Sequence, residues 1–375
     1  MQELGHAGYR LAGGSGWRGG AGLMDVAAFD FALPDELIAQ EPPAERGGSR
    51  LLVMDRQDGG VTHTSFQALP DHLWPGDLLV LNDTRVFPAR LLGRRVPSGG
   101  AVECLLVRRL PAGEDDSVWE ALMHPGQKLK PGAVVVFEQG GVRVHGEVLD
   151  RHFFGRRTIR LRAEGAASVA DAIDRIGHIP LPPYIARADR LSDRDRYQTV
   201  FARERGSIAA PTAGLHFTAA MLETLAQRGI ERATVTLHVG YGTFKPVRVE
   251  QVEAHSVDAE HYTVSPGTAD ALTRARRDGR RIIAVGTTTT RALESLRIDE
   301  AGGVVPAAGE TTLFIHPGHR FRLVQGLVTN FHLPRSSLLM LVAALGGTER
   351  VLAAYRAAVA ARYRFYSYGD AMLIL

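Results

Sequence analysis

The most restrictive feature of this sequence is a stretch of short β-rich runs, residues 86 to about 163, which interrupts alternating strand and helix patterns. Gly and Pro turns separate these runs at regular intervals, and evenly spaced short strands favour a small antiparallel barrel. The alternation on either side is typical of an α/β domain. The sequence therefore predicts a larger α/β domain with a small inserted antiparallel β-barrel. The expected barrel strands are 101–110, 117–123, 133–138, 142–149 and 157–162.

This pattern divides the chain into four segments. Residues 1–23 contain eight glycines and no periodic apolar pattern, so we expect a disordered extension there. Residues 24–85 form the first part of the α/β domain, 86–163 the inserted barrel, and 164–375 the second part. A GxGxxG match at residues 14–19 lacks a strand before it and a helix after it, so it predicts no dinucleotide-binding loop.

Composition excludes several classes of function. Hydrophobic residues make up 45% and charged residues 23% of the chain, and no run approaches the roughly 18 apolar residues of a membrane span. The single cysteine, Cys104, cannot form an internal disulfide, a thiolate zinc site or an iron–sulfur cluster within one chain. We therefore expect a cytoplasmic protein without metal or membrane. Lys occurs only at three positions, and the abundant Arg residues permit nucleic-acid binding without requiring it.

Four loops place polar residues at a strand end or a helix start, namely 82–85, 211–218, 286–291 and 329–336. In a mostly parallel sheet the carboxyl ends of strands carry the ligand-binding loops, so convergence of these four would form one polar pocket. Asn and Asp also make ordinary turns, and a Gly-Thr start also simply caps a helix, so both alternatives stay open. With no nucleophile or metal motif, the remaining chemistry is proton transfer and electrostatic positioning. These observations favour a transferase or a lyase.

Two histidines lie among glycine and proline residues that restrict the backbone path. His216 precedes an expected helix, and His238 ends an alternating strand that is followed by glycines. Because the ordinary pKa of histidine lies near neutrality, either can carry a proton. The alternative is that each only fills a polar gap in a core. The residues themselves leave both interpretations open.

Six motifs, in the same order, resemble the S-adenosylmethionine:tRNA ribosyltransferase-isomerase family of queuosine biosynthesis. The resemblance runs from about Phe29 to the C-terminus. The motifs are Leu-Asn-Asp-Thr-Arg-Val (81–86), Pro-Thr-Ala-Gly-Leu-His-Phe-Thr (211–218), His-Val-Gly-Tyr-Gly-Thr-Phe (238–244), Val-Gly-Thr-Thr (285–288), Thr-Asn-Phe-His-Leu-Pro (329–334) and Tyr-Arg-Phe-Tyr-Ser-Tyr-Gly-Asp-Ala-Met (363–372).

This resemblance implies that S-adenosylmethionine serves as a ribosyl donor and co-substrate rather than a methyl donor. The family transfers and isomerises the ribosyl unit onto the aminomethyl group of 7-aminomethyl-7-deazaguanine at the tRNA wobble position. The products are epoxyqueuosine-tRNA, adenine and methionine. The resemblance also implies a cytoplasmic monomer, with an α/β domain and an inserted β-barrel, that uses no metal or other cofactor. A non-catalytic tRNA-binding module is the alternative, and a glycosidase would need a carboxylate pair that the sequence does not reveal.

The chemistry of this family suggests roles for residues in the six motifs. Both the aminomethyl group and the C5′ carbon must lose a proton. Among the expected catalytic residues, His216 or His238 is the base, with His332 or Asp83 as its partner. A sulfonium favours aromatic rings and carboxylates, and the candidates are Phe217, Phe244, Tyr368 and Asp370. The candidates for the methionine carboxylate are Thr287, Thr288 and Arg291. The other expected substrate contacts are Asn82, Thr84, Arg85, Thr212, Gly214, Gly240, Gly242, Thr243, Gly286 and Asn330.

Overall fold

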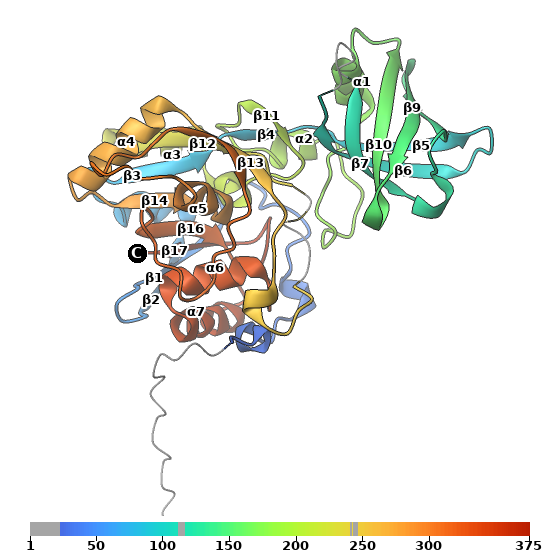
Figure 1. The fold of residues 1–375 in the computed structure, drawn as a ribbon. Coiled ribbons are helices and arrows are strands. Elements are labelled where there is room, and N and C mark those ends of the chain that lie inside the picture. Colours follow the sequence, from blue (N-terminus) through green and yellow to red (C-terminus); the bar gives the residue numbers. More distant parts are fainter. Residues whose placement is uncertain (1–22, 112–116, 241, 243–246) are drawn as a thin grey trace, which may run out of the picture.

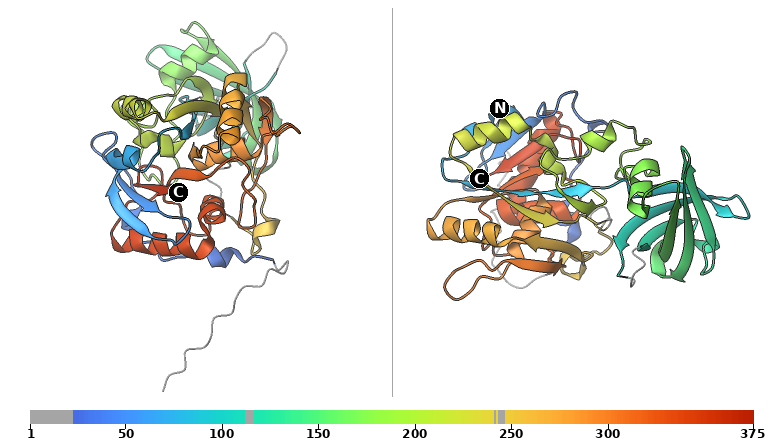
Figure 2. Two further views of the ribbon diagram at one scale, coloured as in Figure 1. Left: turned by 90° about the vertical axis from the view of Figure 1, so that its left-hand side faces the viewer. Right: turned by 90° about the horizontal axis from the view of Figure 1, so that it is seen from above.

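The computed structural model describes residues 23–111, 117–240, 242 and 247–375, and the expected disordered extension thus lies almost wholly outside the described residues. Across these ranges the chain forms a large mixed sheet covered by helices and a separate closed barrel (Figure 1). Two further views show the barrel standing to one side of the sheet and its helices (Figure 2). The predicted fold class, a larger α/β domain with an inserted antiparallel barrel, is confirmed.

The described residues place nine strands in the large sheet, in the order β15-β13-β12-β3-β14-β16-β17-β1-β2. The central strands β12, β3, β14 and β16 run parallel, and most of their side chains are buried because helices cover both faces. The strands are β1 (Arg50–Met54), β2 (Val61–Ser65), β3 (Leu78–Asn82), β12 (Glu231–Leu237), β13 (Glu260–Val264), β14 (Ile282–Val285), β15 (Ala307–Thr311), β16 (Gly326–Asn330) and β17 (Ala371–Ile374). The C-terminal strand β17 lies between β16 and β1, so the end of the chain occupies an interior position in the sheet.

Helices pack against both faces of this sheet. One face contacts α4, α5, α6 and α7, and the other contacts α3 and the short 3-10 helix η3. The bounds are η3 (Phe66–Asp71), α3 (Ala219–Gln227), α4 (Pro266–Arg277), α5 (Thr287–Glu294), α6 (Ser337–Gly346) and α7 (Thr348–Ala360). Local capping explains where several of them begin. For example, Thr218 accepts a hydrogen bond from the backbone N–H of Met221 and so starts α3.

The barrel closes in the order β10-β7-β6-β5-β8-β9 across the described residues. Its strands are β5 (Arg90–Val96), β6 (Ala101–Arg109), β7 (Val118–His124), β8 (Val134–Gln139), β9 (Val142–Arg151) and β10 (Arg156–Glu164). Five of these match the expected strands, but β5 was missed because its three arginines hide the alternation of a half-exposed strand. Helix α1 (Val169–Ile176) buries Ala172, Ile173 and Ile176 in the barrel core.

Two connections join the barrel to the α/β domain. A parallel ribbon of β4 (Thr84–Val86) and β11 (Glu204–Ser207) leads from the sheet toward the barrel (Figure 2). Ion pairs also cross between the two parts, because Arg156 lies 3.3 Å from Asp258 and Arg108 lies 3.6 Å from Glu310. One side of the barrel is therefore held beside the edge of the sheet that carries β13 and β15.

Candidate active site

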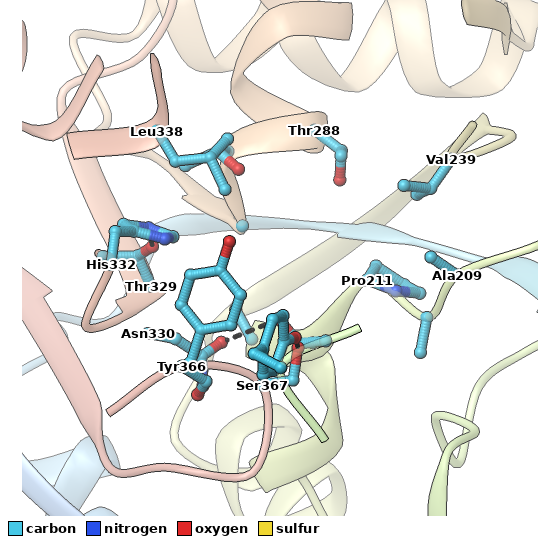
Figure 3. A pocket seen from close by; sticks show the side chains of 16 residues that line it. Ala209, Pro211, Val239, Thr288, Thr329, Asn330, His332, Leu338, Tyr366 and Ser367 are labelled. Atoms are coloured by element: carbon cyan, nitrogen blue, oxygen red, sulfur yellow. Dashed lines mark hydrogen bonds between the residues drawn. The ribbon is translucent and has the colours of Figure 1, made fainter. Parts of the chain in front are cut away.

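A pocket of about 50 Å³ lies where the parallel strands of the sheet end (Figure 3). The segments that follow β12 and β14 contribute Val239 and Gly286–Thr288, and the end of β16 with the segment after it contributes Thr329, Asn330 and His332. The segment leading into the 3-10 helix η6 (Thr212–His216) and the loop before β17 complete the wall. Because these strands run parallel, their carboxyl ends meet at one edge, which is where α/β sheets bind ligands.

Three of the four predicted loops therefore converge on one pocket. The predicted site residues that line it are Thr212, Gly286, Thr287, Thr288, Asn330 and His332. The fourth loop, 82–85, does not border it directly. Its first residue lies one layer behind, where the Asn82 amide nitrogen donates to the Leu237 carbonyl at 3.0 Å and the Thr288 hydroxyl at 3.4 Å. Asn82 thereby supports a wall of the pocket.

Asn330 is the centre of a hydrogen-bond network that determines the state of His216. Its amide nitrogen lies 3.1 Å from the Tyr366 carbonyl, which can only accept, so this atom is a donor. The same nitrogen lies 3.1 Å from His216 Nε2, which therefore accepts. His216 Nδ1 then carries the proton and donates to Ser49 Oγ at 2.8 Å. The Asn330 oxygen accepts from Thr212 at 3.1 Å, which completes the network.

His216 is consequently a neutral, buried side chain with partners on both ring nitrogens. Burial lowers the pKa of His216 to about 4, and the nearby Arg364 and Arg46 act in the same direction. The ring lies behind Asn330, which itself borders the pocket. It thus contacts the pocket through Asn330 rather than directly.

Of the four predicted catalytic residues, His332 is the one that borders the pocket within the described part of the chain. Its Nε2 lies 2.9 Å from the Thr329 hydroxyl, and its backbone N–H donates to the Tyr355 hydroxyl at 3.1 Å. Burial lowers the pKa of His332 to about 3, so the imidazole is neutral at pH 7. Figure 3 shows its ring on the same side of the pocket as Thr329.

Asp83 lies in a separate polar cluster. Its carboxylate accepts from the Thr236 hydroxyl at 2.6 Å and pairs with Arg203 at 2.7 Å. Its backbone carbonyl accepts from the N–H groups of Arg203 and Glu204. These contacts tie β12 to the connection toward the barrel, outside the pocket.

His238 lies in the same outlying region as Asp83. Side chains alternate along an extended segment, so His238 points away from the face on which Val239 lines the pocket. Its Nδ1 lies 2.8 Å from the Thr84 hydroxyl, and burial together with the neighbouring His261 lowers its pKa. Arg85 is exposed on β4. The structure therefore does not bring His238, Thr84 or Arg85 to the pocket wall.

A second cavity of about 30 Å³ contains two other predicted residues, Arg291 and Gly242. The Arg291 guanidinium forms a buried ion pair with Glu260 and donates to the Leu313 carbonyl at 2.8 Å. Glu260 also accepts from the backbone N–H of Gly240 at 3.0 Å. Leu338 of α6 borders both this cavity and the larger pocket, so the two are neighbours.

Several predicted residues support the pocket from within the fold. Phe217 is fully buried against Phe66, and the Tyr368 hydroxyl donates to Asp193 at 3.1 Å. At Gly214 an added Cβ would lie 2.8 Å from Phe201, so the tight packing of η6 requires glycine. Thr243 and Phe244 lie outside the described residues.

The loop before β17 contributes pocket residues that the motifs alone did not indicate. Tyr366 lines the pocket with φ 73°, a conformation that few residues other than glycine adopt. The loop is held by Asp370, which accepts from the backbone N–H groups of Arg50 and Arg364, both at 2.8 Å. Glycine at position 369 allows the chain to pass close to the Arg364 carbonyl, because a Cβ there would lie only 2.4 Å from that oxygen.

Tyr184 holds the Tyr366 ring from the side. The two ring centroids are 3.9 Å apart at an interplanar angle of 88°, and the Tyr184 hydroxyl bonds to Ser367. All three residues line the pocket, and the Tyr366 ring stands in its middle in Figure 3. The repeated tyrosines between residues 363 and 370 are the sequence signal that could have indicated Tyr366, but its positive φ is invisible in sequence.

Comparison with known proteins decides the family. A family model described as queuosine biosynthesis protein matches residues 26–374. The chain belongs to this family. The resemblance found in the six motifs is thereby confirmed.

Relatives of this chain carry a more specific name. S-adenosylmethionine:tRNA ribosyltransferase-isomerase of Symbiobacterium thermophilum is 51% identical, over 94% of this chain and 100% of the relative. The enzyme of the same name from Anaeromyxobacter sp. (strain Fw109-5) is 54% identical, over 94% and 99%. A crystal structure of S-adenosylmethionine tRNA ribosyltransferase from Thermotoga maritima is 39% identical, with a TM-score of 0.51 over 93% of this chain and 100% of that one.

Two further observations concern metals and membranes. In the ranges that the structure describes, no group of three or more His, Cys, Asp or Glu side chains is arranged to hold a metal ion. In the same ranges, no single helix has the length and apolar character needed to cross a membrane. The helices α6 and α7, which are sharply bent relative to each other, reach that length and apolar composition only when they are taken together.

Proposed function

We propose that this chain is an S-adenosylmethionine:tRNA ribosyltransferase-isomerase and that the larger pocket is its active site. It transfers and isomerises the ribosyl moiety of S-adenosylmethionine onto the aminomethyl group of 7-aminomethyl-7-deazaguanine at the tRNA wobble position. Epoxyqueuosine-tRNA, adenine and methionine are the products. The observation that carries this assignment is identity of 51–54% to relatives of that name over 94% of the chain. S-adenosylmethionine is then the co-substrate and tRNA the acceptor.

The pocket must widen to admit the co-substrate. Its volume of about 50 Å³ is far below the roughly 300–1,000 Å³ of ligand sites. Leu338 separates it from the second cavity, so displacement of this side chain would join the two spaces. We infer that S-adenosylmethionine occupies both, with Leu338 moving aside.

Helix α5 borders both spaces and suits the methionine end of the co-substrate. The Gly286 cap has φ 91° and offers no side-chain hydrogen bond, so the first N–H groups of α5 remain available to an anion. Thr287 and Thr288 add hydroxyls at this end. One turn later, the Arg291–Glu260 pair offers both signs of charge to an amino-acid zwitterion. These features support the proposed carboxylate role of Thr287, Thr288 and Arg291.

The sulfonium is best accommodated by an aromatic ring. Among the described residues, no Asp or Glu lines the larger pocket, whereas Tyr366 and Tyr184 do. A cation over an aromatic face gains about 0.5–2 kcal/mol, more when water is excluded. The lowered pKa values of His216 and His332 keep both imidazoles neutral, so neither repels the cation. We assign sulfonium recognition to Tyr366, oriented by the edge of Tyr184.

Proton transfer is assigned to His332 because it borders the pocket. His216 acts as a positioning residue, since it orients Asn330 and through it the Tyr366 carbonyl. His238 and Asp83 lie outside the pocket wall, and we propose that they hold the connection between the sheet and the barrel. Removal of His332 should therefore lower turnover by roughly 10²-fold or more, whereas removal of His238 should have a smaller effect on the chemical step.

The test is incubation of the protein with S-adenosylmethionine and tRNA that carries 7-aminomethyl-7-deazaguanine. Release of adenine together with a gain in tRNA mass supports the assignment. Methylated RNA with S-adenosylhomocysteine would instead indicate a methyltransferase. Tight tRNA binding without any product would indicate a non-catalytic binding module.

A further inference from the structure

Two adjacent phenylalanines project into solvent at the tip between β9 and β10. Phe153 is 87% exposed and Phe154 is 95% exposed, and both belong to the single-turn 3-10 helix η5 (Phe153–Gly155). Strands β9 and β10 are labelled in Figure 1. A buried aromatic ring removes about 150–250 Å² from water, so two rings left outside forgo a large stabilisation. Such a pair therefore indicates a contact surface.

Two residues with positive φ and a buried arginine define the shape of the tip. Phe154 has φ 54° and Gly155 has φ 81°, which turn the chain sharply outward. Beneath them, Arg157 is only 1% exposed, and its guanidinium donates to the carbonyls of Leu129 and Arg156, both at 2.7 Å, and of Gly126. Burying a charged side chain is costly, and here it links the loop 126–130 to the tip. The aromatic rings are thus presented on a prepared support.

The tip and the loop that supports it are positively charged, whereas Asp150 and the Arg156 partners Glu120 and Asp258 place acidic groups at their border. The segments 126–130 and 151–157 contain no acidic residue, and they expose Lys128, Lys130 and Arg151. Within the described part of the chain, the buried Arg157 has no carboxylate partner that would neutralise it. Exposed aromatic rings among cations are the combination that binds unpaired nucleotides, through base stacking and phosphate contacts.

The tip also lies beside the candidate active site. Arg156 follows Phe154 by two residues, and its guanidinium lies 3.3 Å from Asp258, which borders the second cavity. The same guanidinium lies 2.9 Å from Glu120 of the barrel, so it holds the tip against the α/β domain. A nucleotide bound at the tip would therefore be close to the cavities.

We propose that Phe153 and Phe154 form a stacking platform for unpaired bases of the tRNA anticodon loop, with Lys128, Lys130 and Arg151 contacting the phosphates. This inference rests on the proposed function, because the wobble base belongs to that loop. Entry of its aminomethyl group into the pocket removes the base from the stack of its neighbours. The platform supplies a replacement surface for those neighbours beside the pocket.

The test compares the full-length protein with the double variant Phe153→Ala/Phe154→Ala. Stacking contributes about 1–3 kcal/mol per base, so loss of one stacked base weakens tRNA binding by about 5- to 150-fold. Fluorescence anisotropy with labelled substrate tRNA measures the affinity, and the KM for S-adenosylmethionine should not change. Phe153→Tyr/Phe154→Tyr should bind as the wild type does, whereas Phe153→Leu/Phe154→Leu should be weakened like the Ala variant. Trp74→Ala is the matched control, because Trp74 is exposed just before β3, at the opposite edge of the sheet from the pocket.

The outcomes separate this inference from the proposed function. If the wild type releases no adenine with modified tRNA, the proposed function fails, and the tip variants then report on tRNA binding alone. If the wild type is active and the Ala variant binds tRNA equally well, the platform is refuted. Full binding by the Leu variant would show an apolar contact without stacking and would also refute it. A change of sedimentation in the Ala variant at unchanged tRNA affinity would assign the tip to contact between two copies of the chain.

Discussion

Replacement of His216 by Gln should remove a defined pH dependence from the free energy of unfolding. The pKa of His216 is about 4 in the folded protein and about 6.5 in an unfolded chain. As the pH falls, the unfolded chain binds the proton first. The stabilisation is therefore fully present above pH 6.5 and is lost as the pH falls through this window toward 4. Over that window it amounts to about 3 kcal/mol, of which about 2 kcal/mol is lost by pH 5.

Urea unfolding at pH 7.5 and pH 5.0, followed by circular dichroism, measures this difference. The Gln variant is less stable at pH 7.5, because Ser49 and Asn330 lose their bonds to the imidazole. Its deficit relative to the wild type should shrink by about 2 kcal/mol at pH 5.0. His124→Gln, at an exposed histidine of the barrel, is the control. Its difference from the wild type in the free energy of unfolding should be the same at pH 7.5 and pH 5.0.

If the wild type and the His216→Gln variant lose the same free energy of unfolding between pH 7.5 and pH 5.0, this reasoning is refuted. Such a result would mean that folded His216 takes up a proton near neutral pH, contrary to its two partners and its burial. The enzymatic readout is the pH profile of turnover. Because we propose that His216 positions Asn330 rather than transferring a proton, His216→Gln should retain the shape of the wild-type profile between pH 6 and 8. Loss of the acidic limb would instead identify His216 as the base.

Three further substitutions and one salt titration test the rest of the site. Tyr366→Leu should raise the KM for S-adenosylmethionine by about 2- to 30-fold, while Tyr366→Phe retains the aromatic face and should not; equal effects would exclude ring recognition of the sulfonium. Glu260→Gln leaves the buried Arg291 charge without its partner and should lower the free energy of unfolding by about 3–5 kcal/mol, as measured by urea unfolding; a neutral effect would argue against a buried pair. Asp370→Asn should raise the same KM, because the carboxylate that holds the Tyr366 loop and pairs with Arg50 is lost; an unchanged KM would show that the loop is held otherwise. Finally, the affinity for tRNA should fall steeply between 50 and 200 mM salt if cationic side chains contact phosphates, and a flat response would contradict such contacts.

The sequence alone was sufficient for the architecture because the signals for it are local. Period-two alternation and Gly or Pro turns predicted five of the six barrel strands. Thr218 and Ser168 cap the starts of α3 and α1, and such a cap depends on residues only three positions apart in the sequence. The six motifs likewise sufficed for the family. The strand β5 was not predicted because its arginines interrupt the apolar alternation, and only the folded barrel shows that these positions face solvent.

The composition of the pocket could be predicted only in part. The loops at Thr212, Thr287 and Asn330 were found, because polar residues that follow apolar strands gather at one edge of a parallel sheet. The loop at 82–85 follows the same rule, yet Asp83 turns to Arg203 and Thr236 instead of the pocket. The rule locates an edge of the sheet but does not say which side chains face inward there.

The sequence by itself determined the fold class, the family and the edge of the sheet that carries the site, because each depends on patterns that span few residues. Only the tertiary structure decided which candidates share the pocket. A single step along the extended chain after β12 sends His238 to the other side from Val239, and Asn330 stands between His216 and the pocket. The loop in which Tyr366 has its positive φ is likewise held by contacts of Asp370 with Arg50, 320 positions away in the chain. Contacts between residues so far apart produce no periodic pattern in the sequence, so they can be identified only in the folded structure.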